Sequence, residues 1–183
     1  MNKGKICVVT GARAEFGLMT NLLREIKKSK KLKLFLIVTG MHLMNQFGNT
    51  YKEIQREGFK IYKKVKLSKS ILEKGYVERS VGIGIIQFSK ILRKMKPDLV
   101  CIPCDRYEML GPAISCYLAN IPIAHFYGGE TTKGSQDDIT RNSITKMSNL
   151  HFVTHLSHKK RVIQMGENPK NVFLVGNMTI DNI

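Results

Sequence analysis

The chain has 183 residues, of which 43% are hydrophobic and 24% are charged, and its formal net charge is +16 at pH 7. This composition is typical of a globular chain with one sizeable core and argues against intrinsic disorder. No apolar run approaches the roughly 20 residues that a membrane span needs, and the N-terminus does not resemble a signal peptide, so we expect a cytoplasmic protein without a membrane partner.

Short apolar and β-branched runs alternate with segments of helical period along the chain. Seven runs are predicted strands, at residues 5–11, 32–40, 60–67, 98–103, 121–128, 150–155 and 172–176. Six segments are predicted helices, at residues 16–30, 46–57, 76–95, 106–119, 138–149 and 157–165. This alternation predicts an α/β fold, a Rossmann-like parallel sheet with helices on both faces.

Ligands of such sheets bind at the carboxyl ends of the strands. Four polar side chains follow predicted strands, and we expect them at one edge of the sheet: Arg13, His42, Asp105 and Glu130. Arg13 belongs to the glycine turn "TGARAEFG", where free backbone N–H groups and the helix dipole favour an anion. The turn matches neither the dinucleotide fingerprint nor a Walker A sequence, so a plain turn with a solvated arginine is the alternative.

The segment "CIPCDRYEML" allows two further interpretations. Asp105 and Glu108 have the spacing of a helix N-cap and its reciprocal partner. Cys101 and Cys104 form a C-x-x-C before a helix, a pattern found in thiol redox sites. Buried, unreactive thiols in a reducing compartment are the simpler explanation for the cysteines.

The segment "GGETTKGSQDDITRNS" places carboxylates beside a sharp turn. Gly128 and Gly129 let the backbone turn and leave Glu130 at the strand end, with Asp137 and Asp138 close behind. Ser135 and Asp138 also fit a capping box for the next helix. Several carboxylates at one strand edge are an arrangement that can supply a base and an acid at neutral pH.

The histidines do not predict a metal site, and we expect no cofactor. His125 lies in a predicted strand and is interpreted as an interior histidine, whereas His151, His155 and His158 have helical spacing. The basic excess would attract polyanions, but the lysines are dispersed and lack interleaved aromatic residues or a recognisable motif, so nucleic-acid binding is disfavoured.

Taken in order, several segments resemble the hydrolysing UDP-N-acetylglucosamine 2-epimerases, in particular the branch that serves sialic-acid and legionaminic-acid biosynthesis. These segments are "VVTGARAEFGLM", "LIVTGMHLMNQFGNTYKEIQREGF", "MKPDLVCIPCDRYEMLGPA", "IPIAHFYGGETTKGSQDDITRNSITKMSNLHFV" and "VFLVGN". The resemblance covers the N-terminal of two Rossmann-like domains in a glycosyltransferase-B-like arrangement. It implies a domain over residues 1–176 and the start of the interdomain connection at 177–183, with the second domain outside this sequence.

The resemblance implies a hydrolysing 2-epimerase that removes the C2 proton of a UDP-sugar, eliminates UDP to give 2-acetamidoglucal, and adds water to give N-acetylmannosamine. The sugar could also be a UDP- or GDP-linked diacetamido sugar. By resemblance Asp105, Glu130 and one of Asp137 and Asp138 are catalytic. The implied substrate-binding residues are Arg13, His42, Arg106, Gly128, Gly129 and Arg141.

The chain departs from the family's usual motifs at three positions near the implied site. Cys104 stands where the family has glycine, while Tyr127 and Asn142 stand where it has histidine. Two alternatives therefore stay open: a non-catalytic sugar-nucleotide-binding or oligomerising domain, and a basic nucleic-acid-binding domain. Apolar surface on the face that would meet a second domain predicts a homo-oligomer.

Overall fold

The computed structural model describes residues 3–68, 74–178 and 180. Seven parallel strands form one sheet in the order β3-β2-β1-β4-β5-β6-β7, which confirms the predicted Rossmann-like sheet. The strands are β1 Gly4–Thr10, β2 Leu32–Thr39, β3 Ile61–Val65, β4 Leu99–Pro103, β5 Ile123–Phe126, β6 Leu150–Val153 and β7 Val172–Leu174. The α-helices are α1 Arg13–Lys28, α2 Tyr51–Arg56, α3 Tyr76–Met95, α4 Leu110–Leu118, α5 Asp137–Met147 and α6 Leu156–Gln164.

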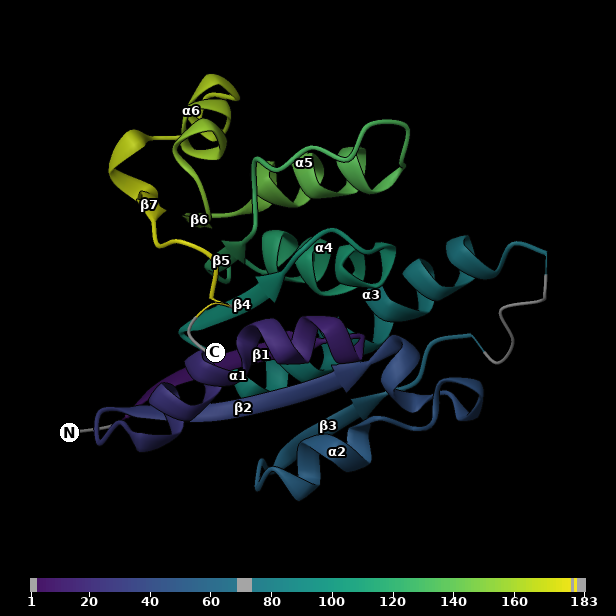
Figure 1. Cartoon of the computed structure of the whole chain (residues 1–183). Coiled ribbons are helices and arrows are strands. Elements are labelled where there is room, and N and C mark those ends of the chain that lie inside the picture. Colours follow the sequence, from purple (N-terminus) through teal and green to yellow (C-terminus); the bar gives the residue numbers. More distant parts are fainter. Residues whose placement is uncertain (1–2, 69–73, 179, 181–183) are drawn as a thin grey trace.

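Helices cover both faces of the sheet, and α1 lies on the side opposite α3 and α4 (Figure 1). Successive residues of a strand point to opposite faces, so Val8 of β1 packs with α1 and α2 whereas Cys7 and Val9 pack with α3, α4 and α5. A smaller cluster of Val153, Val162 and Val172 joins α6 to β6 and β7. Strands β1, β4 and β5 in the middle of the sheet are therefore buried from both sides, as in other parallel sheets, whereas the edge strands β3 and β7 are partly exposed.

The strand order reverses beside β1, because β1 pairs with β2 on one side and with β4 on the other. At such a switch point the helices that follow the two strands leave in opposite directions, and the carboxyl ends of the strands are left accessible. The loops after β1, β2 and β4 meet there, with the loop after β5 next along the edge.

The predicted helix at 46–57 is wrong in its first half. Two short 3₁₀ helices, Gly40–Leu43 and Asn45–Phe47, come first, and α2 begins only at Tyr51. Gly48 and Asn49 have φ angles of 79° and 51°, in the left-handed region where a right-handed helix cannot continue.

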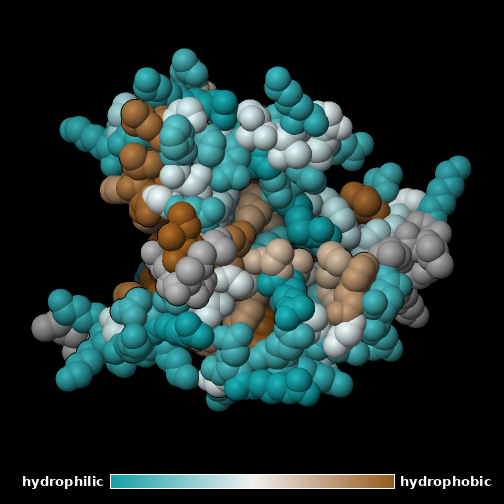
Figure 2. All heavy atoms as spheres, in the orientation of Figure 1, coloured by the Kyte–Doolittle hydropathy of each residue, from teal (hydrophilic) through white to brown (hydrophobic). Residues whose placement is uncertain are grey.

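Apolar side chains gather at the edge formed by β7. Figure 2 shows hydrophobic atoms over β7 and the residues that follow it, on a face that is otherwise mostly hydrophilic. Phe173, Leu174 and Val175 are between 42% and 50% exposed, which makes this an uncovered apolar edge. Among the described residues, no helix combines the length and apolar character needed to cross a membrane.

Candidate active site

The turn after β1 is occupied by a side chain of the protein itself. Glu15 folds back from α1, and its Oε2 accepts hydrogen bonds from the backbone N–H groups of Gly11 (2.6 Å) and Ala12 (3.1 Å). Burial raises the pKa of Glu15 to about 7, with nearby Glu108 adding to the rise and these hydrogen bonds opposing it. The Gly11 and Ala12 N–H groups are therefore not free to bind an anion in this structure, because an internal carboxyl group takes them.

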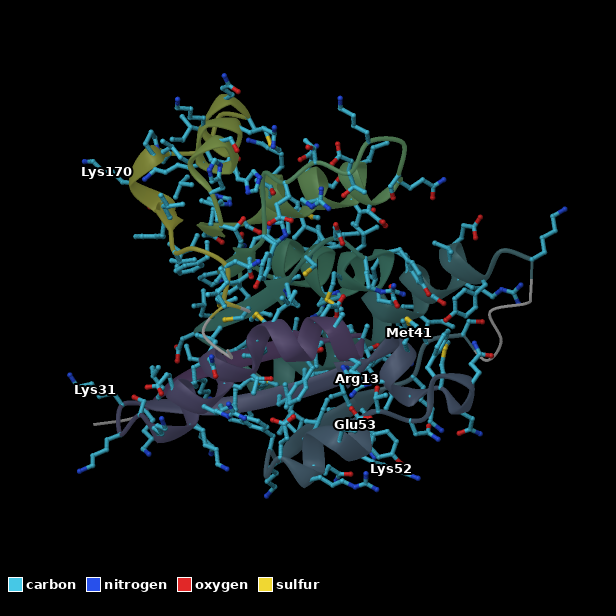
Figure 3. The ribbon with its side chains drawn as sticks, viewed as in Figure 1. Arg13, Lys31, Met41, Lys52, Glu53 and Lys170 are labelled. Atoms are coloured by element: carbon cyan, nitrogen blue, oxygen red, sulfur yellow. The ribbon has the colours of Figure 1, made fainter. Side chains whose placement is uncertain are left out.

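Arg13 is the cation that remains available at this turn. It is the first residue of α1, and its side chain is 77% exposed. Arg13 and Glu53 of α2 lie next to each other in Figure 3, with the Arg13 Nε 3.1 Å from a Glu53 carboxylate oxygen. An exposed pair of this kind is weak, so Arg13 can exchange Glu53 for another anion.

His42 lies beneath the turn and does not line an open surface. It is fully buried, with Nε2 3.0 Å from Thr10 Oγ1 and Nδ1 2.7 Å from Thr50 Oγ1. Burial lowers the pKa of His42 to about 4, so the ring is neutral at pH 7. The interpretation of His42 as a residue that lines the cleft is corrected: as placed, it supports the turn.

Asp105 and Glu108 do not form the predicted helix cap. The buried Glu108 carboxylate accepts hydrogen bonds from Arg106, at 2.8 Å from Nη2 and 3.3 Å from Nε. Asp105 turns the other way and pairs with Arg141. The reason is that a 3₁₀ turn, Tyr107–Met109, precedes α4, so that the helix begins only at Leu110 and its N-cap is Met109 instead of Asp105.

Arg141 of α5 connects the loops that carry the candidate carboxylates. It is 3% exposed, and its Nη1 donates to the Glu130 backbone oxygen at 2.8 Å and to Asp138 Oδ1 at 2.9 Å. Its Nη2 donates to Asp105 Oδ2 and to Thr132 Oγ1. Arg141 thus holds together the segments after β4 and β5, and the Nη1 and Nη2 bonds all go to protein oxygen atoms.

The two neighbouring aspartates of α5 have different surroundings. Asp138 accepts from Arg141 and from the Thr132 backbone N–H at 2.9 Å, whereas Asp137 is exposed and accepts from the Ser135 hydroxyl at 2.7 Å. The predicted capping box between Ser135 and Asp138 is therefore wrong, because Asp138 is drawn to the arginine. Only Asp138 belongs to the Arg141 cluster.

Glu130 follows β5 and is partly buried, with 34% of its side chain exposed. Its Oε1 accepts a hydrogen bond from Thr154 Oγ1 at 2.8 Å and lies 3.9 Å from His158 Nδ1. Sequence reasoning missed Thr154 and His158, although Thr154 directly follows β6 at the same edge. The expectation of helical spacing also fails for His151, which lies buried in β6.

His125 is the interior histidine that the sequence predicted. It is fully buried, with Nε2 2.8 Å from the Cys104 backbone oxygen and Nδ1 3.1 Å from Thr145 Oγ1. Gly128 and Gly129 adjoin it, and both face helices: an added Cβ at Gly128 would lie 3.1 Å from Thr145 Oγ1, and one at Gly129 would lie 2.5 Å from the His158 backbone oxygen.

Cys104 lies among the acidic side chains. Burial raises the pKa of its thiol well above the ordinary value, and Glu15, Asp105 and Glu130 raise it further. Burial also raises the pKa of Cys101 to about 12. The redox interpretation fails, because a redox-active thiol needs a lowered pKa. The φ of Cys104 is 58°, in the left-handed region that favours glycine.

Two further observations concern metal binding and a surface hollow away from this edge. Among the described residues, no group of three histidine, cysteine, aspartate or glutamate side chains could hold a metal ion. A surface hollow of about 490 Å³ between β3 and α3 is lined by Tyr62, Lys63, Gln87, Lys90, Ile91 and Lys94. Its lining residues include no carboxylate.

Comparison with known proteins shows which protein family the sequence matches. The family described as UDP-N-acetylglucosamine 2-epimerase matches residues 24–183. The GDP/UDP-N,N'-diacetylbacillosamine 2-epimerase (hydrolyzing) of Campylobacter jejuni is 47% identical over 97% of this chain and 46% of its own length. The UDP-N,N'-diacetylbacillosamine 2-epimerase (hydrolyzing) of Legionella pneumophila is 36% identical over 98% and 47%. The chain thus spans about half the length of these relatives.

Solved structures agree on the fold. The UDP-GlcNAc 2-epimerase from Neisseria meningitidis, solved bound to UDP-GlcNAc, matches 97% of this chain and 48% of its own, with a TM-score of 0.86 at 19% identity. The lipopolysaccharide outer core galactosyltransferase WaaB matches 94% of this chain and 45% of its own, with a TM-score of 0.63 at 14% identity. The chain has the fold of one half of such proteins.

Proposed function

The chain belongs to the UDP-N-acetylglucosamine 2-epimerase family, and from this we propose that it provides the N-terminal half of a hydrolysing sugar-nucleotide 2-epimerase. In the proposed reaction a base removes the C2 proton of a 2-acetamido sugar, and the nucleoside diphosphate leaves from C1 to give a 2-acetamidoglucal. Water then adds to the double bond and gives the free 2-epimer, which is N-acetylmannosamine when the substrate is UDP-N-acetylglucosamine. C2 is a weak carbon acid, so the first step needs a positioned base.

The grouping of Asp105, Asp138 and the Glu130 segment around Arg141 is the observation that carries this proposal. We assign proton transfer to Asp105, Glu130 and Asp138, which are 20%, 34% and 32% exposed and can therefore reach a substrate while their positions are fixed. We prefer Asp138 to Asp137 because only Asp138 bonds Arg141. Arg141 itself is assigned a positioning role, because its terminal nitrogens already serve protein oxygens.

The departing diphosphate needs a positive partner. We assign this role to Arg13, since it is exposed at the edge of the sheet while the Gly11 and Ala12 N–H groups of its turn are taken by Glu15. Arg106, held by Glu108 with 34% of its side chain exposed, is a second candidate. The formal charge of +16 would favour the approach of a dianionic substrate.

For the sugar, we propose a nucleoside diphosphate-linked 2,4-diacetamido sugar ahead of UDP-N-acetylglucosamine. The support is that the Campylobacter and Legionella relatives, at 47% and 36% identity, are both named for N,N'-diacetylbacillosamine. We further propose that a second domain completes the site and that residues 177–183 begin the connection to it, because relatives are about twice as long. A homo-oligomer is proposed from the exposed apolar edge at Phe173, Leu174 and Val175, and a cytoplasmic location from the free cysteines.

The test is proton NMR in deuterated water of each sugar nucleotide with this chain joined to the second domain that we propose. Release of free nucleotide together with a 2-epimer that carries deuterium at C2 is the expected result, and Glu130→Gln should abolish it. Equal turnover by Glu130→Gln and the unchanged protein would refute the assignment of the base. Tight binding of the sugar nucleotide without turnover would favour the alternative of a sugar-nucleotide-binding domain, which the half-length match also allows.

A further inference from the structure

Glu130 has neighbours on β6 and α6 that the proposed reaction does not yet use. Thr154 follows β6, and its Oγ1 lies 2.8 Å from Glu130 Oε1 and 2.8 Å from His158 Nδ1. The three side chains therefore form a continuous row from α6 to the carboxylate. Thr154 lies between the other two and contacts both.

The direction of the hydrogen bonds follows from the groups themselves. A carboxylate only accepts, so the single O–H of Thr154 is donated to Glu130 Oε1. Thr154 Oγ1 then has lone pairs but no second proton for the histidine, and His158 Nδ1 must carry a hydrogen to bond it. The arrangement requires the neutral His158 ring to be the Nδ1–H tautomer, with Nε2 unprotonated.

A close backbone contact fixes the distance between the two ends of the row. Gly129 has a φ of 77°, and a Cβ at this position would lie 2.5 Å from the His158 backbone oxygen and 2.9 Å from Val162 Cγ2. Arg161 of α6 also donates a hydrogen bond to the Gly129 backbone oxygen. Gly129 thus rests directly on α6, and the next residue, Glu130, is held beside His158.

We propose that Thr154 and His158 are positioning residues for Glu130, which hold its Oε1 through a hydrogen-bonded row and direct its Oε2 toward the substrate. This inference rests on the proposed function only for the role of Glu130 as a base. The geometry supports it in one further respect: Oε2 of Glu130 accepts no hydrogen bond from the part of the chain that the structure describes. One oxygen is anchored and the other is available for a proton.

The first experiment reads the row without requiring turnover. Nitrogen-15 NMR of the histidine rings in the 183-residue protein distinguishes the two neutral tautomers. We expect His158 as the Nδ1–H form and His155 as the opposite, Nε2–H form, because His155 Nδ1 accepts from the Ser157 backbone N–H at 3.2 Å. Thr154→Val should abolish the preference at His158 and leave His155 unchanged, while Thr154→Ser should preserve both. An Nε2–H tautomer at His158, or no response to Thr154→Val, would overturn the proposal.

The same spectra test the coupling to Glu130. Burial lowers the pKa of His158, Glu130 raises it, and Arg161, His155 and Arg141 lower it. Glu130→Gln should therefore lower the pKa of His158 further. Asp137→Asn is the matched control, because Asp137 bonds Ser135 instead and should leave this titration unchanged.

Measurements of turnover then distinguish the positioning role of Thr154 and His158 from the role of Glu130 as the base. In the active protein, Thr154→Val should lower kcat by about 10- to 100-fold with little change in KM, because a displaced base is slow without being a weaker binder. Thr154→Ser should restore most of the rate. If Glu130→Gln is inactive but Thr154→Val is as fast as the unchanged protein, the positioning role is refuted and the proposed function stands. If Glu130→Gln turns over normally, the proposed base is refuted, while the tautomer measurement still decides whether the row exists.

Discussion

Replacing Glu15 with glutamine should change how stability depends on pH. The pKa of the Glu15 carboxyl is about 7 in the folded protein against an ordinary value of 4.5, so the folded state binds the proton more tightly. As the pH rises from about 4.5 the unfolded chain loses this proton first, so stability falls until the folded carboxyl also ionises near pH 7. Glutamine keeps an oxygen acceptor for the Gly11 and Ala12 N–H groups but cannot ionise.

The expected effect follows from those two values. Between pH 5 and pH 8 the unchanged protein should lose about 2.5 kcal/mol of stability through Glu15, and the variant should lose none of it. The free energy of unfolding of Glu15→Gln relative to the unchanged protein should thus improve by about that amount over this range. Its absolute value depends also on the new amide nitrogen, since Glu15 Oε1 has no partner in the structure and a buried N–H there costs about 1–3 kcal/mol.

Urea unfolding followed by circular dichroism at four pH values measures this, and dichroism is chosen because the chain has no tryptophan. Burial lowers the pKa of His42 and His125 from 6.5 to about 4, so these histidines also make stability depend on pH below about 6.5. They are present in both proteins, and their contribution cancels in the difference. Glu25→Gln is the control, because Glu25 lies on the same helix with 69% of its side chain exposed. A difference between Glu15→Gln and the unchanged protein that stays constant from pH 5 to pH 8 would refute the reasoning.

Three further predictions concern Arg141, Gly129 and His42. Arg141→Met should lower the free energy of unfolding by about 2–3 kcal/mol, less than for a fully buried pair because its two aspartate partners are partly exposed, and urea titration measures it. Gly129→Ala should lower the free energy of unfolding by about 3 kcal/mol, because the added Cβ would clash with α6. Gly134→Ala is the control and should lower it by only about 1 kcal/mol, because Gly134 also has a positive φ but an added Cβ there would meet nothing within 4 Å. A similar melting temperature for the two variants would contradict the packing argument. The His42 ring should stay neutral in NMR titrations until the pH approaches about 4. Because the pKa of His42 in the folded protein lies below its ordinary value of 6.5, its contribution to stability is present above pH 6.5 and is lost as the pH falls. Titration of the ring near pH 6.5 would show that it is not buried.

Long periodic patterns made most of the fold predictable from the sequence. Helix α3 has the predicted bounds, Tyr76–Met95, because its apolar residues recur at helical spacing over 20 residues. The prediction at 46–57 failed where a change in the sign of φ at Gly48 and Asn49 interrupts a segment with suitable composition. Such local backbone choices depend on the loops that surround them, and a periodic pattern does not contain that information.

The candidate site was predictable only in outline. The rule of strand ends placed Asp105 and Glu130 at the same edge, but the arginine that organises it lies 36 residues from Asp105 in the sequence. The position of Glu15 was hidden for another reason: a glutamate in the first turn of a helix usually interacts with the helix dipole in solvent, whereas here it folds into its own turn. The direction and burial of the side chain determine the contacts of both Arg141 and Glu15, and residue spacing in the sequence predicts neither the direction nor the burial.

The contact between Gly129 and α6 also makes Glu130 part of a larger rigid unit. Val162, which an added Cβ at Gly129 would meet, packs with Val153 and Val172 in the small core that attaches α6 to the sheet. The loop cannot shift toward α6, so fluctuations of that helix reach the carboxylate through a backbone contact. The packing of Val153, Val162 and Val172, which are buried away from any substrate, thus limits the positional fluctuation of the proposed base Glu130. Looser packing of these valines should appear first as faster amide hydrogen exchange around residue 130.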